Sequence, residues 1–216
     1  MSQAFARLRH ITATTEHPLL YGLDIETDTQ TDGLDPTRSR IVAVAVVGED
    51  VSAVFDGDEA EILRSLEQLL AELPPGVLVT WNGSRFDLPF LSDRAALTGV
   101  ELGLQLAPSP YRSSWHDPLP GHDGGYAASW DLHQHLDAYF VFRSDVGASM
   151  HLSCALKPLA RMVGLRPVEV DRSQLHRLTA QEMHDYVASD AHVTRELALR
   201  RWPTAQNAID PYPIGT

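Results

Sequence analysis

The chain has 216 residues, a length that fits one domain with a substantial hydrophobic core. Hydrophobic residues make up 44% of it and charged residues 21%, and 29 acidic against 17 basic residues give a net charge of −12. This balance argues against diffuse electrostatic binding to duplex nucleic acid, which needs a basic face. It does not exclude an enzyme that acts on nucleic acid, because carboxylates that bind divalent cations turn local negative charge into a phosphate site.

The N-terminal segment and the apolar runs bear on the compartment. MSQAFARLRH leads into no apolar stretch, and the longest apolar run, around Ile41–Gly48, is far shorter than a membrane span. We therefore expect a cytoplasmic protein with no membrane partner. Cys154 is the only cysteine of the sequence, which excludes an intramolecular disulfide and a thiolate cluster. Its position between two leucines favours a small buried hydrophobic residue over a nucleophile.

Hydrophobic periodicity predicts alternating strands and helices in chain order. Thr179 and Glu182 have the spacing of a capping box at the start of the last helix. The order predicts an α/β domain with a mixed sheet of five to six strands flanked by helices. The predicted strands are Leu19–Thr27, Arg40–Gly48, Val51–Asp56, Val77–Trp81 and His135–Phe140, and the predicted helices are Glu59–Leu73, Asp87–Thr98, Leu156–Val163 and Thr179–Arg201.

Two segments lack this periodicity. Gln105–Trp130 is rich in proline and glycine and is predicted to be a long loop, which inside a domain is functional or disordered. Its aromatic residues either stack on bases or anchor the loop to the core, and both interpretations stay open. From Pro203 an extended tail is expected, so residues 1–216 form one domain with a core of about 18–202. The loop aromatics are Tyr111, Trp115, Tyr126 and Trp130.

Acidic residues occur at three places where predicted elements begin or end. Asp24 and Glu26 are two residues apart on a strand, so their carboxylates point to the same face. Two carboxylates behind an apolar run repel each other and are costly to desolvate, a conflict that a divalent cation removes. Asp87 follows the strand and turn of WNGSRFD, where it caps the helix or points back into a site. Tyr186 and Asp190 are four residues apart and share one face of the last helix.

In this order, the DIET, NGSRFD and YVASD stretches match the three motifs of the DEDD (DnaQ-like, RNase H-like fold) 3′–5′ exonucleases. WNGSRFDLPFL and the stretch around HLDAYF are most similar to the proofreading domain of family-B DNA polymerases. The resemblance spans roughly residues 20–200, so the chain resembles a stand-alone relative. In the histidine branch of the family a histidine stands five residues before the last aspartate. Asp185 has that position here, whereas Tyr186 has the position of the tyrosine branch.

The resemblance implies a role for each matching residue. Asp24, Glu26 and Asp190 would hold a first Mg²⁺ or Mn²⁺ that generates the attacking hydroxide, and Asp24 would bridge to a second ion supported by Asp87. Oxygen-only ligands suit these hard cations. Tyr186 would orient the water. The residues implied to contact the terminal nucleotide are Thr27, Asn82 and Phe86, for the last two of which a turn amide and a core aromatic are equal alternatives.

Four histidines outside the motifs are not expected to bind a metal ion. His116-Asp117 and His122-Asp123 match no defensible metal spacing and are expected to be solvated loop residues. His133 and His135 share a strand face and are expected to make hydrogen bonds.

Three charged residues outside the motifs have two interpretations each. Asp137 either braces the site or is an ordinary strand-end residue. Lys157 and Arg161 share a helix face that either touches phosphates or, as the favoured interpretation, is solvated.

The leading functional prediction is trimming of single-stranded DNA or RNA 3′ ends to nucleoside monophosphates, with DNA favoured modestly and repair as its setting. Nothing in the sequence identifies a sensor of the 2′-hydroxyl group. A phosphodiesterase for dinucleotides is a second enzymatic alternative. A catalytically silent interaction module is the alternative from another class, although all five site positions are filled here. Protein partners cannot be predicted.

Overall fold

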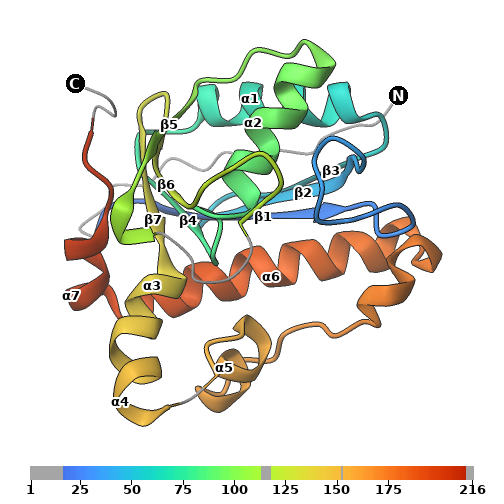
Figure 1. Ribbon diagram of the computed structural model, residues 1–216. Helices are drawn as coiled ribbons and strands as arrows, with labels where there is room; N and C mark the ends of the chain where they lie inside the picture. Colours follow the sequence, from blue (N-terminus) through green and yellow to red (C-terminus); the bar gives the residue numbers. More distant parts are fainter. Residues whose placement is uncertain (1–16, 113–117, 152, 213–216) are drawn as a thin grey trace.

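A computed structural model describes residues 17–112, 118–151 and 153–212, whose arrangement is shown in Figure 1. The first half contains β1 (Leu20–Thr27), β2 (Ile41–Val47), β3 (Ser52–Asp56), α1 (Glu59–Glu72), β4 (Val77–Thr80) and α2 (Asp87–Thr98). The second half contains β5 (Leu104–Pro108), β6 (Tyr126–Trp130), β7 (His133–Asp137), α3 (Ala138–Phe142), α4 (Ala148–Met150), α5 (Leu156–Met162), α6 (Ala180–Arg200) and α7 (Trp202–Ala205). Short 3₁₀ segments lie at Pro110–Arg112, Arg172–Arg177 and Gln206–Ala208, and a π-helical turn lies at Arg143–Gly147.

The strands form one mixed sheet in the order β3-β2-β1-β4-β7-β6-β5. The central pairs β1–β4 and β4–β7 are parallel, and the other pairs are antiparallel. The predicted fold class is confirmed, but the sheet has seven strands where five or six were expected. The two ends of the predicted loop 105–130 pair with each other as β5 and β6, with Leu104 opposite Trp130. The hydrogen bonds between β5 and β6 therefore form strands in a segment whose sequence has little hydrophobic periodicity.

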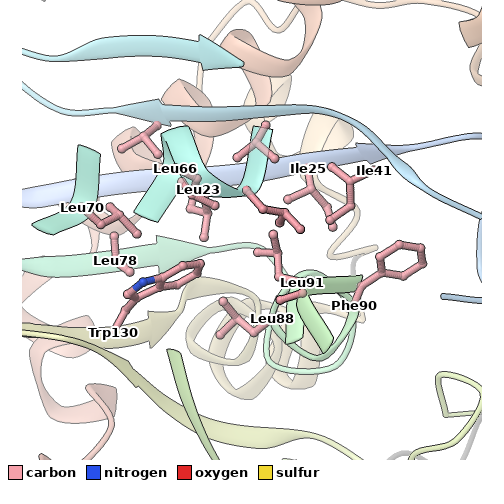
Figure 2. Close-up of a cluster of buried hydrophobic side chains, with 14 of the residues drawn as sticks. Leu23, Ile25, Ile41, Leu66, Leu70, Leu78, Leu88, Phe90, Leu91 and Trp130 are labelled. Atoms are coloured by element: carbon pink, nitrogen blue, oxygen red, sulfur yellow. The ribbon is translucent and has the colours of Figure 1, made fainter. Parts of the chain in front are cut away.

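Helices cover both faces of the sheet, with α1 and α2 on one side and α6 along the other (Figure 1). Side chains of β1 alternate between these two sides. Leu23 and Ile25 point into the core beneath α1 and α2, where Figure 2 shows them beside Leu66 and Leu91. Burying each such aliphatic side chain stabilises the folded state by about 1.5–3 kcal/mol. The alternate residues of β1 consequently face α6.

Trp130 belongs to the same core, although the sequence predicted it to lie at the end of a loop. The indole is fully buried among the leucines of Figure 2, and its Nε1–H donates to Glu67 at 2.8 Å. A buried indole needs such a partner for its single donor. Trp130 therefore anchors the β5–β6 hairpin to α1.

Two predicted boundaries are wrong. The fifth strand ends at Asp137, not at Phe140, because the Asp137 carboxylate accepts a hydrogen bond from the Tyr139 N–H at 3.1 Å and starts α3 as its N-cap. The part of the expected tail up to Ala208 is helical instead of extended, with Pro203 in the first turn of α7, where the missing N–H has no cost. Beyond α7, Asp210 is buried and accepts from Arg112, from the His135 ring at 2.7 Å and from the Ala128 N–H at 2.9 Å.

No helix among the described residues is long and apolar enough to cross a membrane.

Candidate active site

Three carboxylates from two elements meet on the α6 side of the sheet. Asp24 and Glu26 come from β1, and Asp190 comes from α6. Each offers one oxygen atom, and these three oxygens lie within 4.8 Å of one another. Gly22 makes the meeting possible, because its missing side chain lets β1 approach the backbone of Ala191. The predicted pairing of the first and third motifs is thus present in the fold.

Asp87 reaches the same cleft from the turn after β4. It is the first residue of α2, the N-cap position is held by Phe86 without a side-chain cap, and the Asp87 carboxylate accepts from the Ile25 N–H. The helix-cap interpretation of Asp87 is therefore wrong, and its carboxylate points back towards β1. Its oxygens lie outside the close trio of Asp24, Glu26 and Asp190.

Asp137 holds the turn that carries Asp87. Its carboxylate accepts from the Asn82 N–H at 2.8 Å, from the Ser84 N–H at 3.1 Å and from the Ser84 hydroxyl at 2.5 Å. Asn82 has a positive φ of 65°, a conformation that asparagine adopts more readily than most residues. The buried Asp137 therefore braces the turn, which agrees with the first of its two interpretations.

α6 presents Tyr186 and Asp190 one turn apart, as expected from their spacing. The predicted capping box is present, with the Thr179 hydroxyl accepting from the Glu182 N–H and the Glu182 carboxylate accepting from the Thr179 N–H at 2.8 Å. Tyr186 is fully buried, a feature that the sequence did not indicate. Its hydroxyl and Oδ1 of Asp190 have no hydrogen-bond partner among the described residues. Buried oxygens without partners are costly, and a cation and a water molecule are the groups that would satisfy them.

Two basic side chains, Lys157 and Arg172, lie beside this acidic cluster. The Lys157 ammonium lies 3.2 Å from Asp190 Oδ2 and 3.8 Å from the centroid of the Tyr186 ring, and it donates to the Val168 carbonyl at 2.8 Å. The expectation of a solvated helix face is therefore wrong for Lys157. Arg161, one turn further along α5, is exposed and pairs with Glu169 instead.

Arg172 lines the cleft together with the four carboxylates, and it was not singled out in the sequence. It lies on a 3₁₀ turn 18 residues before Asp190, with no motif around it. Partial burial acts against its charge, yet Tyr186, Glu26, Asp24 and Asp190 together raise the pKa of Arg172. Only the tertiary fold brings this guanidinium to the acidic residues.

Burial and mutual repulsion disfavour the ionised carboxylates. Burial is the largest cause in each case: it raises the pKa of Glu26 to about 7 and that of Asp87 to about 7. Burial and the charges of Asp87, Glu26 and Asp190 raise the pKa of Asp24 well above its usual range. Burial also raises the pKa of Asp190 to about 6, while Lys157 lowers it. A cluster with this electrostatic strain and only oxygen donors fits Mg²⁺ or Mn²⁺.

The cleft above the carboxylates has a volume of about 1270 Å³. Thr27, Asn82 and Phe86, the residues expected to contact a terminal nucleotide, line it. The Thr27 hydroxyl donates to the Gly33 carbonyl at 2.6 Å, and the Phe86 ring lies 5.4 Å from that of Phe90. All three therefore border the same cleft as the four carboxylates.

Of the histidines considered as metal ligands, His133 and His135 make hydrogen bonds, as expected. His133 pairs with the Leu70 carbonyl at 2.9 Å, and His135 lies between Thr80 at 2.8 Å and Asp210. His122 bridges Asp93 and the Tyr126 hydroxyl, so it is held in place instead of solvated. His116-Asp117 lies outside the described residues.

The loop aromatics and Cys154 lie in different environments. Tyr126 is fixed by its bond to His122, which anchors the loop, and Tyr111 is 93% exposed. Trp115 lies outside the described residues. Cys154 is half-buried beside Phe142 and Leu159, and burial raises the pKa of its thiol, which suits a packing residue.

The fold and the site together define a class of protein. In this class a mixed sheet and the helix that crosses it bring their carboxylates together. The chain belongs to the RNase H superfamily, whose family model matches residues 23–178. That match ends before Tyr186 and Asp190, which the structure brings to the matched part.

Similar proteins are DNA polymerases. A catalytic polypeptide of DNA polymerase epsilon from Arabidopsis thaliana is 30% identical over 146 residues, covering 66% of this chain and 6% of the polymerase. A DNA polymerase of Thermococcus litoralis is 30% identical over 97 residues, covering 39% of this chain and 6% of the polymerase. The structure of the family B DNA polymerase from Pyrobaculum calidifontis is similar with a TM-score of 0.67 at 22% identity, covering 86% of this chain and 25% of the polymerase. The chain thus spans a small part of the length of these relatives.

Proposed function

We propose that this chain is a metal-dependent 3′–5′ exonuclease of the tyrosine type that releases nucleoside monophosphates from single-stranded nucleic acid, with DNA as the expected substrate and repair as its setting. The observation that carries the proposal is the meeting of Asp24, Glu26 and Asp190, together with the buried Oδ1 of Asp190 that has no hydrogen-bond partner among the described residues. Membership of the RNase H superfamily and the similarity to DNA polymerases support nucleic acid as the substrate.

The residues divide the work between charge and orientation. Asp24, Glu26 and Asp190 would hold Mg²⁺ or Mn²⁺, and Asp87 would support a second ion from the start of α2. When bound, the cations supply Lewis-acid chemistry and offset the charge of the phosphate. The Tyr186 hydroxyl has an unused hydrogen-bonding capacity that suits a water molecule or a phosphate oxygen. Thr27, Asn82 and Phe86 would seat the terminal nucleoside.

Hydrolysis at this site exchanges one bond for another. A water oxygen forms a bond to the phosphorus, and the bond from phosphorus to the 3′ oxygen of the preceding nucleotide breaks. One proton of the water is released and the leaving oxygen takes up a proton. The products are a nucleoside 5′-monophosphate and a strand shortened by one nucleotide with a free 3′-hydroxyl.

The size of the cleft favours a strand over a dinucleotide. Its volume of about 1270 Å³ exceeds the roughly 300–1000 Å³ typical of pockets for small ligands. RNA trimming uses the same chemistry and remains the nearest alternative. A silent binding module is disfavoured because the fold brings all five predicted site residues to one region.

The test measures product release from a 5′-labelled strand and from a dinucleotide, with Mn²⁺, with Mg²⁺ and with EDTA. We expect activity with either metal, none in EDTA, and faster turnover of the strand. Asp24→Asn should lower turnover at least roughly 100-fold, in line with the loss of a well-placed electrostatic group. Asp185→Asn is the matched control, because Asp185 is on α6 next to Tyr186 and outside the acidic trio. Near wild-type turnover of Asp24→Asn would show that the site is misassigned.

A further inference from the structure

One wall of the cleft differs in character from its acidic floor. Trp81, Arg85 and Tyr139 line the same cleft as Asp24 and Asp190. The Trp81 and Tyr139 rings meet edge to face with centroids 6.2 Å apart. The wall therefore offers aromatic surface and positive charge beside the predicted catalytic carboxylates.

Arg143 extends this wall at the end of α3. Its guanidinium lies 5.8 Å from the centroid of the Tyr139 ring, and its Nη1 donates to the Tyr139 hydroxyl at 3.4 Å. Arg85 lies 4.7 Å from the centroid of the neighbouring Phe140 ring. Burial lowers the pKa of Arg85, and the charges of Arg143 and Arg112 lower it further, so several positive charges are close together here.

Local structure fixes the wall to the site. Asp137 caps α3 through the Tyr139 N–H, and the same carboxylate holds the Asn82–Ser84 turn that leads to Asp87. Figure 1 shows α3 directly following β7, and the π-helical turn Arg143–Gly147 continues it. π-helical turns inside helices are frequent at functional sites. One buried aspartate, Asp137, therefore holds both the start of the wall and the turn that leads to Asp87.

The surroundings of Arg143 differ from those of the arginines that pair with a carboxylate in this acidic chain. Arg143 is exposed, and no carboxylate of residues 17–112, 118–151 and 153–212 lies within salt-bridge distance of it. The arginines that do pair with a carboxylate are Arg38, Arg64, Arg94, Arg112, Arg161, Arg195 and Arg201. An arginine held against a tyrosine ring and left without an anionic partner among the described residues suits a phosphate.

Resting on the proposed nuclease function, we propose that Trp81, Tyr139 and Arg143, with Arg85 behind them, bind the single strand upstream of its terminal nucleotide. Arg143 contacts a backbone phosphate, and the exposed parts of the Tyr139 and Trp81 rings accept a base by stacking. The contact carries no base specificity. It makes the enzyme select a strand of several nucleotides over a dinucleotide.

The test measures binding without turnover. A fluorescein-labelled single strand of about 12 nucleotides is titrated with Asp24→Asn protein in Mn²⁺ at several salt concentrations, and anisotropy is recorded. Adding Arg143→Gln should weaken binding roughly tenfold and make the log–log salt slope shallower by about one, whereas Arg143→Lys should keep the slope. Arg64→Gln is the matched control, because Arg64 is an exposed arginine on α1, away from the cleft.

The aromatic part of the wall has its own variants. Tyr139→Leu should weaken binding roughly tenfold through lost stacking, and Tyr139→Phe should keep most of it. A dissociation constant and a salt slope unchanged by Arg143→Gln would overturn the proposal. If the wild-type protein releases no product in Mn²⁺ but Arg143→Gln still weakens binding, the proposed nuclease function fails and the strand-binding wall stands. Melting temperatures of all variants show whether they are folded.

Discussion

Gly22 of β1 and Ala191 of α6 touch through their backbones, so that a Cβ atom on residue 22 would lie 2.0 Å from the Ala191 carbonyl oxygen. Asp24 follows Gly22 by two residues on the same face of β1, and Asp190 precedes Ala191 on α6. The close approach therefore sets the distance between Asp24 and Asp190, two of the proposed metal ligands. A single missing methyl group couples the packing of the helix to the site.

Gly22→Ala is the variant that tests this coupling. We expect a loss of about 1–3 kcal/mol in the free energy of unfolding, because α6 must move away from the sheet. Mn²⁺ affinity should fall with it, as measured by calorimetric titration. Gly57→Ala is the control: residue 57 has a positive φ of 104° and no atom within 4 Å of its Cβ position, so it should lose stability without losing metal affinity. Equal metal affinity in both variants would contradict the coupling.

The stability of the metal-free protein should depend on pH through the buried carboxyl groups. The pKa of Glu26 and that of Asp87 are raised to about 7, against roughly 4 in the unfolded chain. The folded state then binds more protons than the unfolded state between these values, so this stabilisation is full below about pH 4 and lost as the pH rises through about 7. Denaturant unfolding in EDTA should show a decrease of roughly 1–3 kcal/mol between about pH 5.5 and pH 8.

Glu26→Gln should flatten this pH profile, because the variant keeps the shape of the side chain and removes its titration. Saturating Mn²⁺ should raise the stability at about pH 8 most, since binding to the folded state alone stabilises it. A metal-free protein that becomes more stable between about pH 5.5 and pH 8 would contradict the raised pKa values.

Tyr186→Phe should separate catalysis from stability. The hydroxyl is buried without a partner among the described residues, so its removal should leave the metal-free protein equally or more stable. If the hydroxyl positions water or phosphate, the single-turnover rate should fall roughly 10²–10³-fold while Mn²⁺ affinity is kept. A rate equal to wild type would reduce Tyr186 to a packing residue, and Lys157, which lies over its ring, would be the next group to test.

Arg172→Gln should reveal how the guanidinium balances the acidic floor. Without this positive charge the metal-free protein should melt at a lower temperature, and Mn²⁺ should bind roughly two- to fivefold more tightly, the range of a partly screened charge pair. Arg177→Gln is the matched control, since Arg177 lies on the same 3₁₀ segment, is exposed and donates to Gln174. Weaker Mn²⁺ binding in Arg172→Gln would show that the arginine supports the site instead of competing with the cation.

The parts of the site that the sequence predicts are those set by local geometry. Asp24 and Glu26 share a strand face, and Tyr186 and Asp190 share a helix face, because the periods of strand and helix require it. The order of these stretches resembled a known family and so predicted that they meet. What the stretches could not indicate is the full burial of the Tyr186 hydroxyl, which depends on how α5 and Lys157 cover it.

The features that the sequence missed depend on contacts between distant residues. Asp210 lies in a segment with three prolines that predicts an extended tail, yet its carboxylate is buried against Arg112 and His135. Arg172 and Arg143 carry no motif, and the fold alone places Arg172 in the cleft and Arg143 beside Tyr139 of its wall. The proline and glycine content predicted a loop where β5 and β6 pair. These strands are held by their hydrogen bonds to each other and by Trp130 in the core.

The most direct measurement follows a 5′-end-labelled single strand of about 20 nucleotides through time on a sequencing gel, in Mn²⁺ and in EDTA. Our account predicts a ladder that shortens by one nucleotide at a time from the 3′ end in Mn²⁺, no change in EDTA, and resistance of the same strand with a 3′-phosphate. Cleavage of a circular single strand, or undiminished product formation in EDTA, would contradict it.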